Sequence, residues 1–160
     1  MKRPGRLILF LALTCVALGT AATAFAETIL NQTIPYSAMT FNTCTDELVF
    51  VEGSLHTTMR LGTSGDRTHE GVHVQSTGVQ GTTLAGARYV EMEIQNQQFN
   101  YTGLAPFEFT DERTHNLTRL GEDGSFVEGD DLRFHSIIHI TVNANGILTV
   151  DKSEFSSDCR

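Results

Sequence analysis

The sequence predicts an all-β protein: an antiparallel meander of about six to eight long strands that closes into a small barrel, with a two-sheet β-sandwich as the alternative. Three observations indicate this class. Apolar and polar residues alternate with a period of two over most segments of the chain. Clusters of glycine, asparagine and aspartate separate these segments. After residue 26, no stretch shows a convincing apolar stripe with the periodicity of a helix.

The predicted strands follow one another with short connections. The first strong strand covers residues 47–61, and the apolar residues of its one face are Val49, Val51, Leu55, Met59 and Leu61. Further strands are expected over residues 68–79, 88–101, 107–120, 131–142 and 147–155, and residues 28–42 can add another. Short connections favour antiparallel neighbours. Strands this much longer than the usual five or six residues favour a barrel over a sandwich.

The strand predicted over residues 88–101 alternates between apolar and acidic side chains. Val90, Met92 and Ile94 lie on one face, and Glu91 and Glu93 lie on the other. Such alternation is typical of a strand with one apolar and one polar face.

The strand predicted over residues 131–142 has an apolar face that we expect to point to the core. A slip of one residue in its register would move this entire set into water. His135 and His139 must then face away from the core. The following Asn145-Gly146 pair predicts a tight hairpin, because asparagine and glycine adopt positive φ at low cost. The apolar residues of this face are Leu132, Phe134, Ile138, Ile140 and Val142.

The N-terminus has the pattern of an export signal. Basic residues at positions 2, 3 and 6 precede an apolar run over residues 7–18, and Ala24-Phe25-Ala26 matches a cleavage signal. We therefore expect a signal peptide over residues 1–26 and a single β domain over residues 27–160. The expected location of the mature protein is extracellular or in the cell envelope.

The mature chain is strongly acidic. It has eight basic and 19 acidic residues, which gives a formal charge of −11, and Lys152 is its single lysine. Such a surface repels phosphate backbones and anionic lipids. We therefore expect no nucleic-acid partner and, after signal cleavage, no membrane association.

Two cysteines, Cys44 and Cys159, remain after cleavage of the signal peptide. Export to an oxidising compartment favours a disulfide between them. In a closed meander with an even number of strands, this bond would fasten the seam between the first and last strands. A sandwich could also bring the two residues together. The chain contains no Cys-x-x-Cys motif, so a zinc ribbon or a thioredoxin-like role has no support.

The last third of the chain carries a distinctive run. His135 and His139 are followed by Thr141-Val142-Asn143-Ala144-Asn145-Gly146 and by a final Cys159-Arg160. Together with Cys44, Gly53 to His56, Tyr89 and Phe99-Asn100, this pattern resembles a group of small secreted bacterial β proteins over roughly residues 40–160. The resemblance implies an exported bacterial β protein and no particular activity. The overall pattern is also similar to lipocalin-like and allene-oxide-cyclase-like barrels, at the level of the fold alone.

The histidine spacing argues against a metal site on a single strand. Four residues along a strand span about 13 Å, whereas a zinc–nitrogen bond is about 2 Å long. A site would need histidines from neighbouring strands, for example His56 with one of the His69/His73 pair and one of the His135/His139 pair. We expect instead a polar face without metal, and we expect no cofactor.

No catalytic residue is predicted, because the chain has no Gly-x-Ser-x-Gly motif and no cysteine expected to be free. We expect a non-enzymatic β-barrel that binds a small, partly apolar ligand, or a partner, at its open rim. One alternative is a cofactor-free isomerase or cyclase that works in the barrel lumen, and another is a structural or cell-surface module. The candidate ligand-binding residues are His56, Tyr89, Arg133 and His135.

Overall fold

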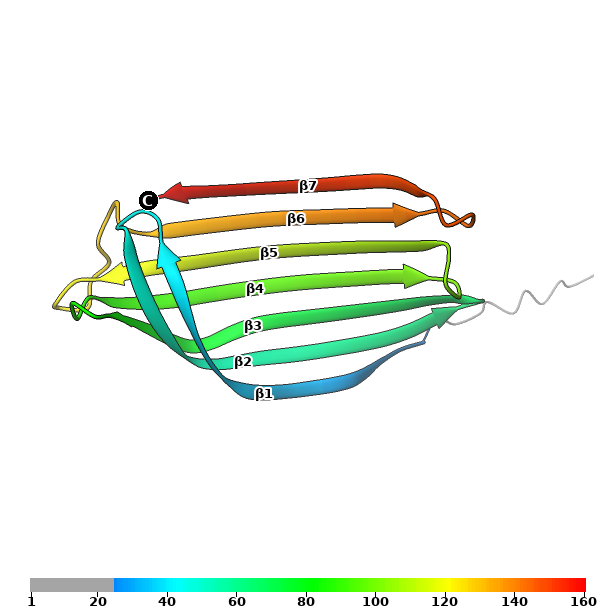
Figure 1. Cartoon of the computed structure of the whole chain (residues 1–160). Coiled ribbons are helices and arrows are strands. Elements are labelled where there is room, and N and C mark those ends of the chain that lie inside the picture. The colour runs from blue at the N-terminus through cyan, green and yellow to red at the C-terminus, as the bar shows by residue number, and fades with distance from the viewer. Residues whose placement is uncertain (1–24) are drawn as a thin grey trace, which may run out of the picture.

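The computed structural model describes residues 25–160 and shows an all-β protein. Seven strands form one antiparallel sheet in which every strand pairs with its neighbour in sequence (Figure 1). The predicted meander is confirmed, and the segment before residue 43 does add a strand. The strands are β1 (Phe25–Asn42), β2 (Glu47–Ser64), β3 (Arg67–Thr83), β4 (Arg88–Tyr101), β5 (Phe107–Leu120), β6 (Leu132–Val142) and β7 (Leu148–Cys159).

Most of the predicted export signal lies outside the described residues. Strand β1 begins at Phe25, two residues before the start expected for the mature chain. Within residues 25–160, no helix is long and apolar enough to cross a membrane.

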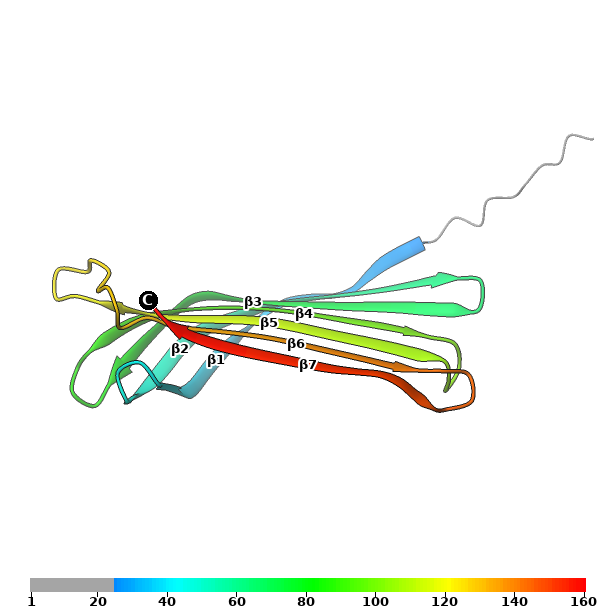
Figure 2. The same cartoon turned by 90° about the horizontal axis from the view of Figure 1, so that it is seen from above.

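The sheet curls strongly at one end. The paired halves of β1 and β2, residues 36–53, cross one face of the other strands toward the C-terminus (Figures 1 and 2). We call residues 36–53 the arm, the sheet face that it crosses the inner face, and the opposite one the outer face. A bulge in β3 lies where the arm bends away: the pairing with both neighbours shifts there, and Gly78 has a φ of +62°. An extra residue on one strand bends and twists a sheet in this way.

The predicted disulfide is present, but the sheet is not closed. Cys44 at the tip of the arm is bonded to Cys159 at the end of β7, with the two Cα atoms 5.6 Å apart. The Asn42 side chain also donates a hydrogen bond of 2.9 Å to the Asp130 carbonyl. No ladder joins β1 to β7 within the described residues, so the two edge strands are linked through the bond and not through a seam.

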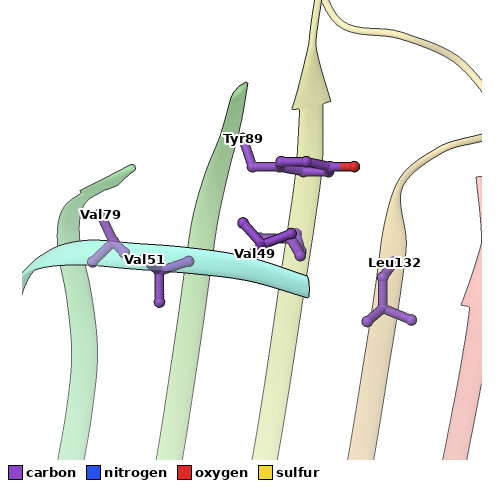
Figure 3. Packing of buried hydrophobic residues seen from close by; sticks show 6 residues of the cluster. Val49, Val51, Val79, Tyr89 and Leu132 are labelled. Atoms are coloured by element: carbon purple, nitrogen blue, oxygen red, sulfur yellow. The ribbon is translucent and has the colours of Figure 1, made fainter. Parts of the chain in front are cut away.

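The fully buried apolar core lies between the arm and the sheet. Val49 and Val51 of the arm pack against residues from four other strands (Figure 3). The close approach depends on Gly81, because a Cβ atom there would lie 2.6 Å from a Val49 methyl group. The core residues are Val49, Val51, Val79, Tyr89, Leu117 and Leu132.

Strand β4 buries the face that carries its carboxylates. Glu91 and Glu93 are 3% and 7% exposed, whereas Val90 and Met92 are 39% and 46% exposed. The pairing with β5 places Glu91 opposite Leu117, which is fully buried beneath the arm. Apolar and acidic side chains therefore do lie on opposite faces of β4, as predicted, but the acidic face is the inner, buried one. The long-range packing of the arm on β5, and not the hydropathy of β4, decides which face is buried.

The apolar residues and the histidines of strand β6 lie on opposite faces, as predicted. Fewer of the apolar residues are buried than expected. Leu132 and Ser136 are buried on the inner face, and His135 and His139 lie on the outer face. Phe134, Ile138, Ile140 and Val142 share the face of Leu132 but are only partly buried. The expectation that all five apolar residues are core residues is therefore wrong. The arm covers the Leu132 end of the inner face, and the other end carries no second layer among the described residues.

The hairpin between β6 and β7 forms at the predicted place with a different turn. Gly146 has a φ of +75°, but Asn145 has no positive φ. The Asn143 side chain instead holds the turn, because its oxygen accepts hydrogen bonds from the backbone N–H groups of Asn145 and Ile147. Positive φ is thus confined to the glycine, where no Cβ opposes it.

Candidate functional site

The structure does not bring the four candidate ligand-binding residues together. Tyr89 is buried in the core, whereas His56, Arg133 and His135 lie on the outer face. Three strands separate His56 on β2 from the other two on β6. Arg133 and His135 are close in sequence on one strand, and Arg133 alone of the four lines the pocket described below.

Tyr89 has a structural hydrogen-bond partner. Its hydroxyl donates to the Glu47 carboxylate near the tip of the arm, and it also contacts the Thr45 hydroxyl at 3.3 Å. Burial, and next the bond to Glu47, raise the pKa of the Tyr89 hydroxyl above its ordinary value, so it stays a donor at neutral pH. The bond from Tyr89 is also the main reason why the pKa of Glu47 is lowered.

This hydrogen bond predicts a pH-dependent contribution to stability. Because the Glu47 pKa is depressed in the folded state, its contribution is present above the unfolded-state pKa of about 4.3 and is lost as the pH falls through the folded-state value. We expect Tyr89→Phe to lower the free energy of unfolding at pH 7 and to differ less from the wild type at pH 2–3. Urea unfolding of both proteins across this range measures the difference. A difference that stays constant down to pH 2 would contradict the role given to Glu47.

The outer face carries five of the six histidines, each bonded to a polar side chain of a neighbouring strand. These contacts join β2 to β1, β3 to β4, and β6 to β5. No two of the histidines share a partner in the described residues, so each ring is engaged within its own cross-strand pair. The pairs are His56–Thr33 at 3.1 Å, His69–Asn100 at 2.6 Å, His73–Asn96 at 2.8 Å, His135–Thr114 at 3.2 Å and His139–Thr110 at 2.8 Å.

A pocket of about 370 Å³ opens on the outer face at the core end of the sheet. Its apolar floor comes from β4, where Val90 and Met92 point outward because the strand buries its glutamates. Phe126, which is 74% exposed, adds an aromatic ring from the loop between β5 and β6. The remaining lining residues are Asn116, Thr118, Asp131, Leu132, Arg133 and Arg160.

The loop that carries Phe126 is shaped by its own hydrogen bonds. Asp123 accepts bonds from the backbone N–H and the hydroxyl of Ser125, and these bonds lower the pKa of Asp123. Gly124 has a φ of +83°, which favours glycine. A bridge between Leu120 and Phe126 then returns the chain to the end of β5. Local turn chemistry therefore places the aromatic ring beside the pocket.

Two guanidinium groups line the same pocket. Among the described residues, Arg133 has neither an ion pair nor a side-chain hydrogen bond within reach. Arg160 bonds to the Asp158 carboxylate at 2.7 Å, and its backbone pairs with Asp131 through two bonds of 3.0 Å. The Asp131 carboxylate is engaged by the backbone N–H of Arg119. The pocket thus joins an apolar floor to a positive charge that is available to an anion.

A second candidate centre lies on the inner face, where β4 meets β5. Glu91, Glu93 and His115 are all buried, and their ligating atoms lie within 4.8 Å of one another. These are the residues of the described chain that could hold a metal. The sequence reasoning missed this group, since it treated the glutamates only as the polar face of a strand and left His115 out of the cross-strand histidine sets. The signal was the Glu-x-Glu spacing, which places both carboxylates on one face of a strand.

No protein-family model, curated protein or solved structure matches this chain. Function therefore has to follow from the outer-face pocket and the buried inner-face cluster themselves.

Proposed function

We propose that this is a secreted, non-enzymatic protein that binds a small, partly apolar ligand with an anionic group in the outer-face pocket. The observation that carries the proposal is the exposed apolar floor of Val90 and Met92 beside the Arg133 guanidinium. The ligand class follows from these two features. A hydrocarbon segment would cover the floor, and a carboxylate would pair with the arginine.

The energetics of β4 support a ligand on this face. Full burial of an aliphatic side chain stabilises a fold by about 1.5–3 kcal/mol. Val90 and Met92 are partly exposed, so they contribute only part of this stabilisation. Phe126 likewise exposes most of its ring. A ligand that packs against these three side chains recovers part of the lost burial on binding.

The charge pattern supports an anion. The mature chain has an excess of acidic residues, so positive charge on its surface is scarce. Arg133 and Arg160 bring two guanidinium groups to one pocket. Arginine forms bidentate hydrogen bonds with carboxylates, which fixes the orientation of a bound headgroup.

The proposal that the protein is secreted is supported by other features. The disulfide between Cys44 and Cys159 is compatible with export, because such bonds persist in oxidising environments. The signal-like N-terminus and the resemblance to small secreted bacterial proteins add support.

Support for a lumen isomerase or cyclase is weaker. That reading needs histidine, arginine and tyrosine side chains to converge on one substrate. Tyr89 is buried and engaged with Glu47, and three strands separate His56 from Arg133. The ligand-binding reading needs only residues that share the pocket.

The proposal is tested with dodecanoate as the probe, by isothermal titration calorimetry on the mature, oxidised protein. At about 0.3 kcal/mol per non-hydrogen atom, its roughly fourteen atoms give a Kd of about 1 mM or tighter. Arg133→Gln should weaken binding about tenfold or more, because it removes a hydrogen bond to a charged group. Dodecyltrimethylammonium, which has the chain but the opposite charge, should bind more weakly than dodecanoate.

Arg60→Gln is the matched control, since Arg60 is an exposed arginine of β2 that does not line this pocket. It should leave dodecanoate binding unchanged. Met92→Asp, which places a negative charge on the floor, should abolish binding. Saturable binding that is indifferent to both Arg133→Gln and Met92→Asp, or no binding at millimolar probe, would overturn the proposal.

A further inference from the structure

The inner face of β4 and β5 holds a cluster of ionisable groups that the ligand pocket does not use. Glu91 and Glu93 stand two residues apart on β4, and His115 of β5 is paired directly with Glu93. All three are buried, with exposed fractions of 3%, 7% and 7%. The pocket residues Val90 and Met92 alternate with the glutamates and point to the opposite face. The two sites therefore share a strand and no side chain.

Glu91 is the unusual member of this cluster. Its side chain is 0% exposed, and neither carboxylate oxygen has a hydrogen bond of good geometry among the described residues. The His115 Nε2 atom lies 3.4 Å from Oε2, and the Tyr36 hydroxyl of the arm also lies beside this carboxylate. Buried carboxylates are normally paired or hydrogen-bonded, because removal from water is costly for a charge. The long contact to His115 leaves the Glu91 carboxylate with lone pairs that a bound cation could use.

Glu93, in contrast, already has a counterion. The Arg113 Nε atom lies 2.9 Å from its Oε1 atom, and the Ser76 hydroxyl accepts a bond from its backbone N–H. With one arginine against two carboxylates, and with a neutral histidine, the cluster has a formal charge of −1. A divalent cation would change that charge to +1 and would give Glu91 its missing partner.

We propose that Glu91, Glu93 and His115 form a buried binding site for a divalent transition-metal cation such as Zn²⁺. The three side chains offer two carboxylates and one imidazole, the donor types found in zinc sites. Their ligating atoms already lie within 4.8 Å of one another. A tetrahedral site with bonds of about 2.0–2.1 Å places its ligands roughly 3.4 Å apart, so small side-chain rotations complete it.

The donor set also indicates the class of cation. Ca²⁺ and Mg²⁺ prefer shells made entirely of oxygen, whereas an imidazole nitrogen suits Zn²⁺ and its transition-metal neighbours. Glu91 can bind through both oxygens, which would supply a fourth donor and leave no open position. A closed four-coordinate site is structural, so the cation would hold β4 to β5 beneath the arm.

Tyr36 of the arm lies against the same cluster. Burial, and next the charges of Glu91 and Glu93, raise the pKa of its hydroxyl above the ordinary value. A side-chain hydrogen bond to Glu91 contributes to the same shift, so the hydroxyl lies beside that carboxylate. This places a residue of the arm at the site, so a bound cation would act on the contact between the arm and the sheet.

The test uses Zn²⁺ alone, added to the mature, oxidised protein after treatment with a chelator. Native mass spectrometry should show one Zn²⁺ per chain, and differential scanning calorimetry should show a higher Tm in the metal-loaded form. Glu91→Gln and His115→Gln should each lose the bound Zn²⁺ and the rise in Tm. His73→Gln, a change on the outer face, is the matched control and should keep both.

A second measurement on the wild type covers variants that fail to fold. Co²⁺ bound at a tetrahedral site with one imidazole should give visible absorption bands that one equivalent of Zn²⁺ removes. Failure of the wild type to bind either metal at one equivalent would overturn the proposal. Retention of the single Zn²⁺ in folded Glu91→Gln, or its loss in His73→Gln, would also overturn it.

Discussion

Replacement of both Cys44 and Cys159 with serine should lower the free energy of unfolding by about 4–5 kcal/mol. The bond closes a loop of 115 residues, and the chain-entropy model gives a cost near this value for a loop of that size. A loss of this magnitude is a large part of the 5–15 kcal/mol that holds a typical domain together. Urea unfolding of the wild type and the double variant, both monitored by circular dichroism, measures it.

The bond matters more here than in a closed barrel. No ladder connects β1 to β7 in the described part of the chain, so apart from the bond the tip of the arm is held by side-chain contacts and by the packing of Val49 and Val51. One of them is the hydrogen bond from the Asn42 side chain to the Asp130 carbonyl. Reduction of the wild type without mutation is the control, and it should reproduce the loss seen in the double variant. A double variant within about 1 kcal/mol of the oxidised wild type would show that the arm stays in place without the bond.

Leu117→Ala should cost about 2–5 kcal/mol of stability, whereas Ile138→Ala should cost less than about 1.5 kcal/mol. Leu117 of β5 is fully buried beneath the arm, so its truncation leaves a cavity between the arm and the sheet. Ile138 lies on the same inner face but beyond the arm, where it is only partly buried. From the sequence alone, Ile138 belongs to the expected core and would be as costly as Leu117.

His139→Ala serves as the outer-face control for this pair. Its ring bonds to the Thr110 hydroxyl, a contact between two partly exposed side chains, and we expect a loss below about 1 kcal/mol. Thermal and urea unfolding of the three variants give the comparison. Equal losses for Leu117→Ala and Ile138→Ala would mean that the open half of the inner face, with its stacked Phe99 and Phe109 rings, is covered in solution.

The local features of the fold were predictable. The limits of β4 and β5 agree with the predicted strands over residues 88–101 and 107–120. Both strands end at clusters of glycine, proline or acidic residues, which cannot continue a strand without cost. The Cys44–Cys159 pairing was also predictable, because only two cysteines follow the expected signal peptide. Each inference needs only neighbours in sequence or a count of residues.

The candidate sites were less predictable. Arg133 was selected from the sequence and does line the outer-face pocket, but the Val90 and Met92 floor was not, since alternation does not show which face of β4 is exposed. The cluster of Glu91 and Glu93 with His115 depends on the register between β4 and β5. The short loop between Tyr101 and Phe107 sets this register, but only the packing of the arm shows that the face with Glu91, Glu93 and His115 is buried.

The sequence by itself determined the all-β class, the order of the strands and the disulfide, because alternation, turn residues and cysteine number are properties of short segments or of the whole composition. The tertiary structure decided where the sheet bends, that it stays open, and that β4 buries its glutamates. The physical reason lies in the arm. A single bulge at Gly78 redirects the paired halves of β1 and β2 across the sheet, and the packing of Val49 and Val51 on Leu117 then fixes the buried face of every strand beneath them.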